Sequence, residues 1–198
     1  MKPTKAWLSR YLDDLSTLTR NASATLPNGA SVRTDAVIDW AVQKLFNLRA
    51  TGGKVMFIGN GGSAAIASHM AVDYSKNGNF PALAFNDAAS LTCLANDLGF
   101  ENVFAHQIEV LGRQDDLLVA ISSSGRSSSI LNAVAAARRK KAAVLTLSGF
   151  DTGNPLRSLG DMNIYVASSS YGFVEIGHLT LCHALLDFAM EWSLETQS

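Results

Sequence analysis

The stretch KVMFIGNGGSAAIASHMAVDYSK, residues 54–76, places an apolar run, a glycine-rich turn and a helical pattern in direct succession. Residues 54–58 are apolar after Lys54, which predicts a buried strand, and the helix after the turn is expected to reach about Lys76. The turn at residues 59–63 ends in a serine that can cap the helix. This order of elements is typical of a strand–helix unit in a parallel sheet.

The same order of strand, loop and helix recurs along the rest of the chain. Further strands are predicted at residues 81–85, 116–121, 142–147 and 162–166. Further helices are predicted at residues 88–97, 101–112, 128–141 and 171–195. Because the strands are almost continuously apolar and helical segments separate them, we predict an α/β fold. It is a three-layer sandwich around a five-stranded parallel sheet with right-handed crossovers.

Two amphipathic helices are predicted before the first strand. Residues 5–24 carry apolar side chains at helical spacing, and a turn at residues 27–29 follows. A second helix is expected to begin with Thr34 as its N-cap and to stop at the Gly52-Gly53 pair. These helices form an N-terminal extension over residues 1–52. Its apolar stripes suit either the core of the same subunit or an interface between subunits.

Composition excludes several classes of protein. The 198 residues are 47% apolar and only 17% charged, which predicts one sizeable core and a surface partly covered by partner subunits. The net charge of −1 provides no basic field for nucleic acid. Cys93 and Cys182 are too few and too far apart for a disulfide framework, and no run reaches the roughly 18 apolar residues of a membrane span. We expect a cytoplasmic protein with no nucleic-acid or membrane partner.

Glycines and serines gather in two loops that follow strands. Residues 59–63 follow the first predicted strand, and residues 122–129 (SSSGRSSS) follow the third. Because helix N-termini at the carboxyl ends of parallel strands present free N–H groups, two such loops predict a phosphate-binding site. The glycines and serines could instead serve only as turns and caps. Residues 59–64 also match the dinucleotide pattern GxGxxA, with Asp87 as its acidic residue.

Imidazoles and carboxylates concentrate on two of the predicted helices. His69 and Asp73 are four residues apart and therefore share one helix face. The final helix carries Glu175, His178 and His183, of which Glu175 and His178 can share a face while the two histidines diverge. A single histidine on an apolar helix is more often a core residue than a ligand. Two helices that each bear both groups nevertheless favour a metal or acid–base site.

Four short motifs of the chain occur together in one known family. They are GNGGSAA at residues 59–65, ND with NDLGF at residues 86–100, ISSSG at residues 121–125, and GHL with a later histidine at residues 177–183. Together they resemble the sugar isomerase (SIS) domain family, and more narrowly its phosphoheptose isomerases. The resemblance implies a single SIS domain over residues 1–198. It also implies a homotetramer with sites at subunit interfaces, to which residues 1–52 contribute.

The resemblance assigns roles to individual residues. Those that would hold the phosphate are Ser122, Ser123, Ser124 and Ser127. Those that would contact the sugar are Asn60, Ser63 and Asp97, and the wider substrate-binding set adds Gly61, Gly62 and Glu175. The acid–base pair would be Asp73 and His183. Some family members bind zinc, and the corresponding positions here are His69, Asp73, Glu175 and His183.

Three positions depart from the family pattern. Asp73 stands where the family has glutamate, so its side chain is one methylene shorter; Glu175 replaces glutamine and Arg126 replaces asparagine. Two ionised carboxylates repel unless a cation lies between them, so Asp73 and Glu175 together predict a divalent metal, with zinc favoured. The alternative is a metal-free site in which one carboxylate is protonated or Glu175 pairs with His178.

The reaction implied by the resemblance is an aldose–ketose isomerisation. Sedoheptulose 7-phosphate would become D-glycero-D-manno-heptose 7-phosphate, a precursor for lipopolysaccharide heptose, by proton transfer between C1 and C2 through an enediol. The alternatives are an isomerase of a different sugar phosphate and a non-catalytic relative that binds the replication initiator. The retained Asp73 and His183 disfavour the second. A regulatory sensor is disfavoured because the chain has no residues to spare for a DNA-binding domain.

Overall fold

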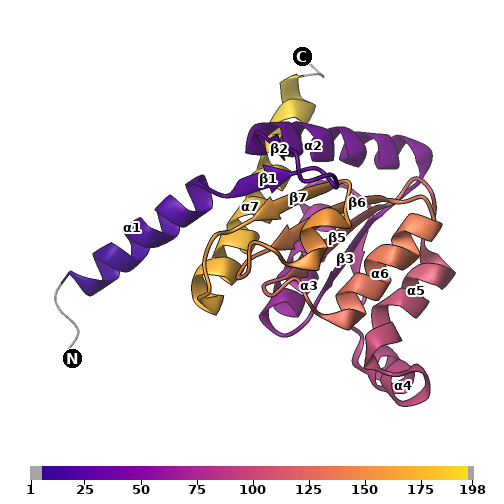
Figure 1. Cartoon of the computed structure of the whole chain (residues 1–198). Helices are drawn as coiled ribbons and strands as arrows, with labels where there is room; N and C mark the ends of the chain where they lie inside the picture. Colours follow the sequence, from indigo (N-terminus) through magenta and orange to yellow (C-terminus); the bar gives the residue numbers. More distant parts are fainter. Residues whose placement is uncertain (1–5, 196–198) are drawn as a thin grey trace.

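A seven-stranded sheet forms the middle layer of the computed structural model, which describes residues 6–195 (Figure 1). The strand order is β2-β1-β7-β6-β5-β3-β4. The five parallel strands are β3 (Val55–Gly59), β4 (Ala82–Ala84), β5 (Leu117–Ser122), β6 (Ala143–Ser148) and β7 (Met162–Tyr165). The prediction of a parallel α/β sandwich is therefore confirmed.

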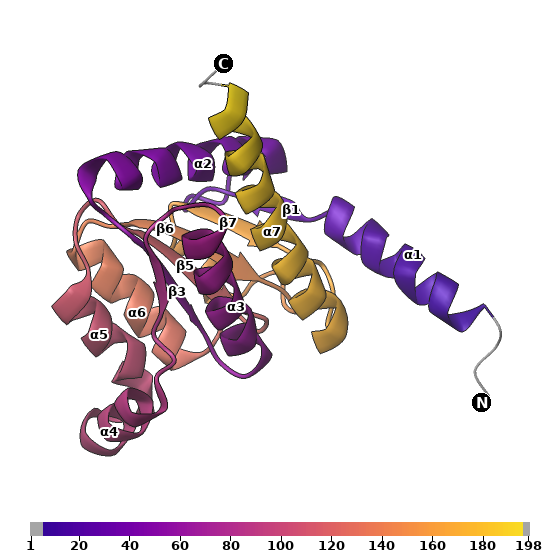
Figure 2. The ribbon, with the colours of Figure 1, turned by 180° about the vertical axis from the view of Figure 1, so that it is seen from behind.

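Helices cover both faces of the sheet. One face carries α2 (Thr34–Thr51), α3 (Gly62–Lys76) and α7 (Tyr171–Glu195); the other carries α4 (Ala88–Leu98), α5 (Val103–Leu111) and α6 (Ser128–Arg139) (Figures 1 and 2). Short 3₁₀ turns at η1 (Phe100–Asn102) and η2 (Pro155–Ser158) complete the chain. Val55 and Phe57 of β3 enter the first core while Met56 and Ile58 enter the second, as alternation along a strand requires.

The N-terminal extension contains a hairpin that the sequence did not indicate. After α1 (Trp7–Arg20), β1 (Ser23–Thr25) pairs antiparallel with both β7 and β2 (Ser31–Val32), so the sheet has seven strands instead of five. Strands of three and two residues are too short to show a period-2 pattern. The predicted cap is also shifted, because Thr34 is the first helical residue and its hydroxyl donates to the carbonyl of Ala22. Lys5, at the start of the predicted first helix, lies outside the described residues.

Helix α1 projects from the body of the molecule (Figures 1 and 2). None of its residues is buried, and Trp7, Leu8 and Leu12 are each more than half exposed. Its contacts are mainly with α7, through the stacked rings of Tyr11 and Phe173. Trp7, Leu8 and Leu12 therefore lie outside the core of their own subunit, whereas Leu18 near the end of α1 packs against it.

Helix α7 is the apolar centre of the helical layer on its face of the sheet. Residues 171–193 are long and apolar enough to cross a membrane by length and composition. In the fold, however, α7 packs against α1, α2, α3 and β6, and Val174, Leu186 and Ala189 are buried in the core. The helix therefore fits the description of a core helix.

Candidate functional site

A cavity of about 230 Å³ lies at the carboxyl ends of β3 and β5, where the two glycine- and serine-rich loops meet. It is lined by Asn60, Gly61, Gly62, Ser63, Ile121, Ser122, Ser123, Ser124, Ser127, Tyr171 and Glu175. The loops meet because β3 and β5 are hydrogen-bonded neighbours whose register pairs Gly59 with Ile121. We call this cavity the serine cavity. Every residue of the predicted substrate-binding set except Asp97 lines it.

Two glycines shape the walls of the serine cavity. Gly125 has a φ of +61°, and a Cβ added there would lie 2.0 Å from Oδ1 of the buried Asn154. At Gly62, an added Cβ would lie 2.4 Å from a carboxylate oxygen of Glu175. Glycine at this position therefore lets the Glu175 carboxylate lie against the first turn of α3 without being displaced.

The serine hydroxyls of the second loop differ in their partners. Ser122 Oγ accepts from the N–H of Gly125 at 3.1 Å, and Ser124 Oγ accepts from the N–H of Arg126 at 3.3 Å. Ser123 Oγ is buried and has no hydrogen-bond partner among residues 6–195. A buried hydroxyl without a partner is costly, so Ser123 is the hydroxyl of this loop that most needs a ligand. A phosphate oxygen can accept its hydrogen bond.

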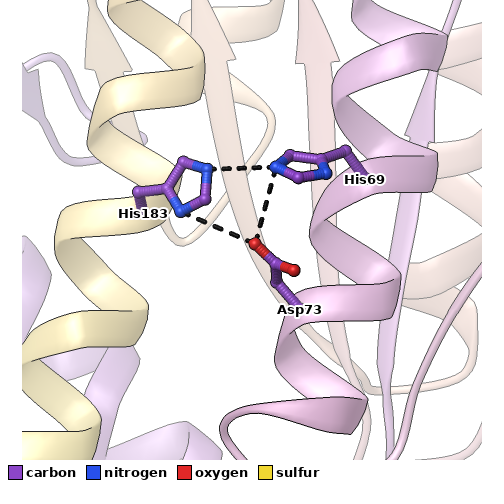
Figure 3. A group of neighbouring side chains, drawn as sticks. All are labelled: His69, Asp73 and His183. Carbon is purple, nitrogen blue, oxygen red and sulfur yellow. Dashed lines mark hydrogen bonds and ion pairs between the residues drawn. The ribbon is translucent and has the colours of Figure 1, made fainter.

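Three titratable side chains form a compact cluster between α3 and α7 (Figure 3). His69 Nε2 lies 3.2 Å from His183 Nε2 and 3.5 Å from Asp73 Oδ2, while His183 Nδ1 lies 3.8 Å from the same carboxylate oxygen. The i, i+4 spacing aligns His69 with Asp73 on α3, and His183 reaches them from α7. We call His69, Asp73 and His183 the triad.

The donor set of the triad fits a divalent metal ion. Each residue offers one ligand atom, and these atoms lie within 4.8 Å of one another. Zinc binds imidazole nitrogen and carboxylate oxygen at roughly 2.0–2.2 Å, so two ligands of one ion lie about 3–4 Å apart. Two imidazoles, one carboxylate and an open fourth position are also the composition of many catalytic zinc sites.

Two predicted site residues lie elsewhere in the chain. Glu175 is eight residues before His183, a rise of about 12 Å along α7, so it lines the serine cavity instead of joining the triad. Asp97 lies near the end of α4 and accepts from its neighbour Asn96. Tyr171, which sequence reasoning missed, lines the cavity from the first turn of α7. Its only signal was its place just after the last strand.

His178 is a core residue, as the simpler sequence interpretation held. It is fully buried, and its Nε2 lies 3.0 Å from the carbonyl of Ser148, to which a neutral ring donates. Burial lowers the pKa of His178 to about 4, so the ring is neutral at physiological pH. No contact joins it to Glu175 among the described residues, and the pair that the sequence left open does not form here.

The buried imidazole predicts a loss of stability in acid. The pKa of His178 is about 4 in the folded protein and about 6.5 when unfolded, so between these values the unfolded chain binds the extra proton. The unfolding free energy should therefore fall as pH drops from 6.5 to 4, by about 3 kcal/mol from this residue. Urea unfolding across this range measures the slope. A His178→Phe variant with the same slope as the natural chain would contradict the assignment.

Comparison with known proteins identifies the family. Residues 20–149 match the model of the SIS domain. The chain belongs to the SIS domain family. The matched residues include both loops of the serine cavity and the α3 members of the triad, while α7 lies beyond them.

Several curated relatives that match this SIS domain protein over most of its length are phosphoheptose isomerases. The enzyme of Escherichia fergusonii is 36% identical over 186 residues, covering 89% of this chain and 95% of the relative. A solved phosphoheptose isomerase from Neisseria gonorrhoeae has 29% identity and a TM-score of 0.77, covering 92% of this chain and 97% of its own. The structure from Francisella tularensis gives 28% identity and a TM-score of 0.79, with 93% and 96% covered.

Proposed function

We propose that this SIS domain protein isomerises sedoheptulose 7-phosphate to D-glycero-D-manno-heptose 7-phosphate. The observation that carries the proposal is that this relative of phosphoheptose isomerases has both the serine cavity and the triad. A serine cavity with an unpartnered buried hydroxyl suits a phosphate, and a triad of imidazoles and carboxylate suits proton transfer. The proposal includes a cytoplasmic location and a role in heptose biosynthesis.

Asp73 and His183 are the proposed acid–base pair. The reaction needs one group to remove the proton from C1 and another to protonate the oxygen on C2, after which the roles reverse to give the aldose. The Asp73 carboxylate and the His183 imidazole are 3.8 Å apart, so both can reach adjacent carbons of one substrate. His69 contacts both groups and keeps them oriented.

The proposed metal is a zinc ion held by the triad through one atom of each residue. This would leave the second carboxylate oxygen of Asp73 and the second ring nitrogen of His183 for proton transfer. Glu175, the fourth position predicted from the sequence, is not within reach of the triad in a single chain, and its ligation stays a prediction. When bound, the ion would supply a Lewis acid that polarises the oxygens of the substrate. The chain itself positions the ligands by burying the opposite faces of α3 and α7 in the core.

Substrate contacts are proposed for the serine cavity. Ser122, Ser123, Ser124 and Ser127 would hold the phosphate, with Asn60, Gly61, Gly62, Ser63 and Glu175 along the sugar. Asn60 already donates to Ser129 at 3.0 Å, which fixes its amide at the edge of the cavity. Asp97 does not line the cavity of its own chain, so its proposed contact requires a neighbouring subunit.

Removing the unpartnered hydroxyl should weaken substrate binding without disturbing the fold. Ser123→Ala deletes no hydrogen bond within the described chain, but it removes one donor to a charged phosphate. Such a bond contributes roughly 1.5–3 kcal/mol, so affinity should fall about ten- to a hundredfold. Isothermal titration with sedoheptulose 7-phosphate measures the change, with Ser158→Ala as the control. Unchanged affinity in a folded Ser123→Ala protein would contradict the proposed hydrogen bond from Ser123 to the substrate phosphate.

A homotetramer is proposed because α1 leaves its apolar side chains uncovered. Trp7, Leu8 and Leu12 are 52%, 61% and 53% exposed, and large exposed apolar residues on one helix indicate a protein partner. Partner copies of the chain would cover residues 1–52 and complete the site. Light scattering at micromolar concentration should give about four times the chain mass of 21.1 kDa. A stable monomer would contradict both the tetramer and a site built between subunits.

Assays with a panel of ketose and aldose phosphates test the proposed function. The natural chain should convert the seven-carbon ketose phosphate in preference to five- and six-carbon analogues. Preference for another sugar phosphate would support an isomerase of different specificity. Absence of turnover with every sugar phosphate would favour a non-catalytic relative that binds the replication initiator.

A further inference from the structure

One buried side-chain hydrogen bond joins α3 to α7. The hydroxyl of Tyr74 on α3 donates to the main-chain carbonyl of Cys182 on α7 at 3.1 Å. Tyr74 is 1% exposed and Cys182 is 3% exposed, so water does not compete for this bond. A hydroxyl buried at this depth requires a partner, and the carbonyl supplies it.

This bond lies next to the triad in sequence on both helices. Tyr74 follows Asp73 directly, and Cys182 precedes His183 directly. The 3.8 Å approach of Asp73 to His183, which Figure 3 shows, and the 3.1 Å bond of Tyr74 therefore span the same gap between the helices. The Asp73–His183 contact lies on the side of the triad, and the Tyr74–Cys182 bond lies on the side of the core.

The ring of Tyr74 also packs against the sheet. Its ring meets Phe57 of β3 edge to face, with centroids 5.0 Å apart, so the hydroxyl is aimed by a rigid strand of the sheet. Burial raises the pKa of Tyr74 well above 10, and the hydroxyl therefore stays a donor.

We propose that Tyr74 is a positioning residue that sets the separation of α3 and α7 at the triad. The side chain of Asp73 is short, so its carboxylate lies 3.8 Å from His183 only while the two helices stay close together. The Tyr74–Cys182 bond holds them close and thereby compensates for the short side chain. The inference rests on the proposed metal and acid–base role of the triad.

The first test is zinc binding by two matched variants. Tyr74→Phe removes the hydroxyl and keeps the ring. Tyr165→Phe is the control, because Tyr165 is also buried and donates to a main-chain carbonyl, that of Phe150, at 2.8 Å. Zinc is titrated into each metal-free protein against a competing chelator, and thermal unfolding is recorded in parallel. Tyr74→Phe should bind zinc about tenfold more weakly, whereas Tyr165→Phe should stay within threefold of the natural chain.

The second test asks whether Asp73 and Tyr74 compensate for each other. Asp73→Glu in the natural background should weaken zinc binding, because the gap is too narrow for the longer side chain. In the Tyr74→Phe background the same change should restore affinity, since the helices can then separate. Equal effects of Asp73→Glu in both backgrounds would overturn the inference, as would normal zinc binding by Tyr74→Phe. If Tyr74→Phe fails to fold, tighter zinc binding by Asp73→Glu alone overturns it.

The outcomes separate this inference from the proposed function. If the natural chain binds zinc and isomerises the sugar phosphate while Tyr74→Phe binds zinc with natural affinity, only the proposed role of Tyr74 is contradicted. A natural chain that binds no zinc removes the proposed metal and this inference with it.

Discussion

Replacing His183 by glutamine should lower kcat for sedoheptulose 7-phosphate by roughly 10²–10⁴-fold, the usual contribution of a positioned acid or base. Glutamine keeps a polar side chain of similar reach but cannot accept and return a proton near neutral pH. His183 is 37% exposed, and its hydrogen-bond and ion-pair partners within residues 6–195 are His69 and Asp73, so the fold should survive the change.

His106→Gln provides the matched control for His183→Gln. His106 is exposed on α5, on the opposite face of the sheet, and its replacement should leave kcat unchanged. Steady-state kinetics and circular dichroism on both variants are sufficient. A folded His183→Gln protein with natural kcat would show that the imidazole takes no part in proton transfer.

Removing the metal should abolish the isomerase activity. Protein purified without a histidine tag should contain about one divalent ion per chain by elemental analysis. Extraction with a chelator should stop turnover, and zinc should restore it, because an ion held by the triad would supply the Lewis acid that polarises the substrate oxygens. Full activity in a metal-free preparation would contradict the metal and leave Asp73 and His183 as a simple acid–base pair.

The parallel core of the fold was predictable because its strands appear in the sequence as apolar runs. The run at residues 54–58 corresponds to β3 within one residue, and the runs at 116–121 and 142–147 correspond equally well to β5 and β6. Each of these strands is almost entirely buried on both faces, so its sequence is almost continuously apolar. The hairpin of β1 and β2 was not predictable, because its pairing depends on β7, which is distant in sequence.

The site was predictable in part. Parallel strands bring their carboxyl ends to one edge, so the meeting of the two serine and glycine loops followed from the strand assignment. The pairing of His69 with Asp73 followed from helical spacing. The approach of His183 from α7 came only through the family resemblance. No local pattern indicates that Tyr74 donates to a carbonyl on another helix. Every residue has a main-chain carbonyl, so the residue type at position 182 does not mark it as the acceptor.

Proton NMR of sedoheptulose 7-phosphate incubated with the natural chain in D₂O tests the isomerisation and its enediol directly. D-glycero-D-manno-heptose 7-phosphate should accumulate to equilibrium with deuterium at C2, since an enediol is reprotonated there by a group that exchanges with solvent. No product should form with His183→Gln on the same timescale. A natural chain that binds the ketose phosphate and leaves it unchanged would contradict the proposed reaction.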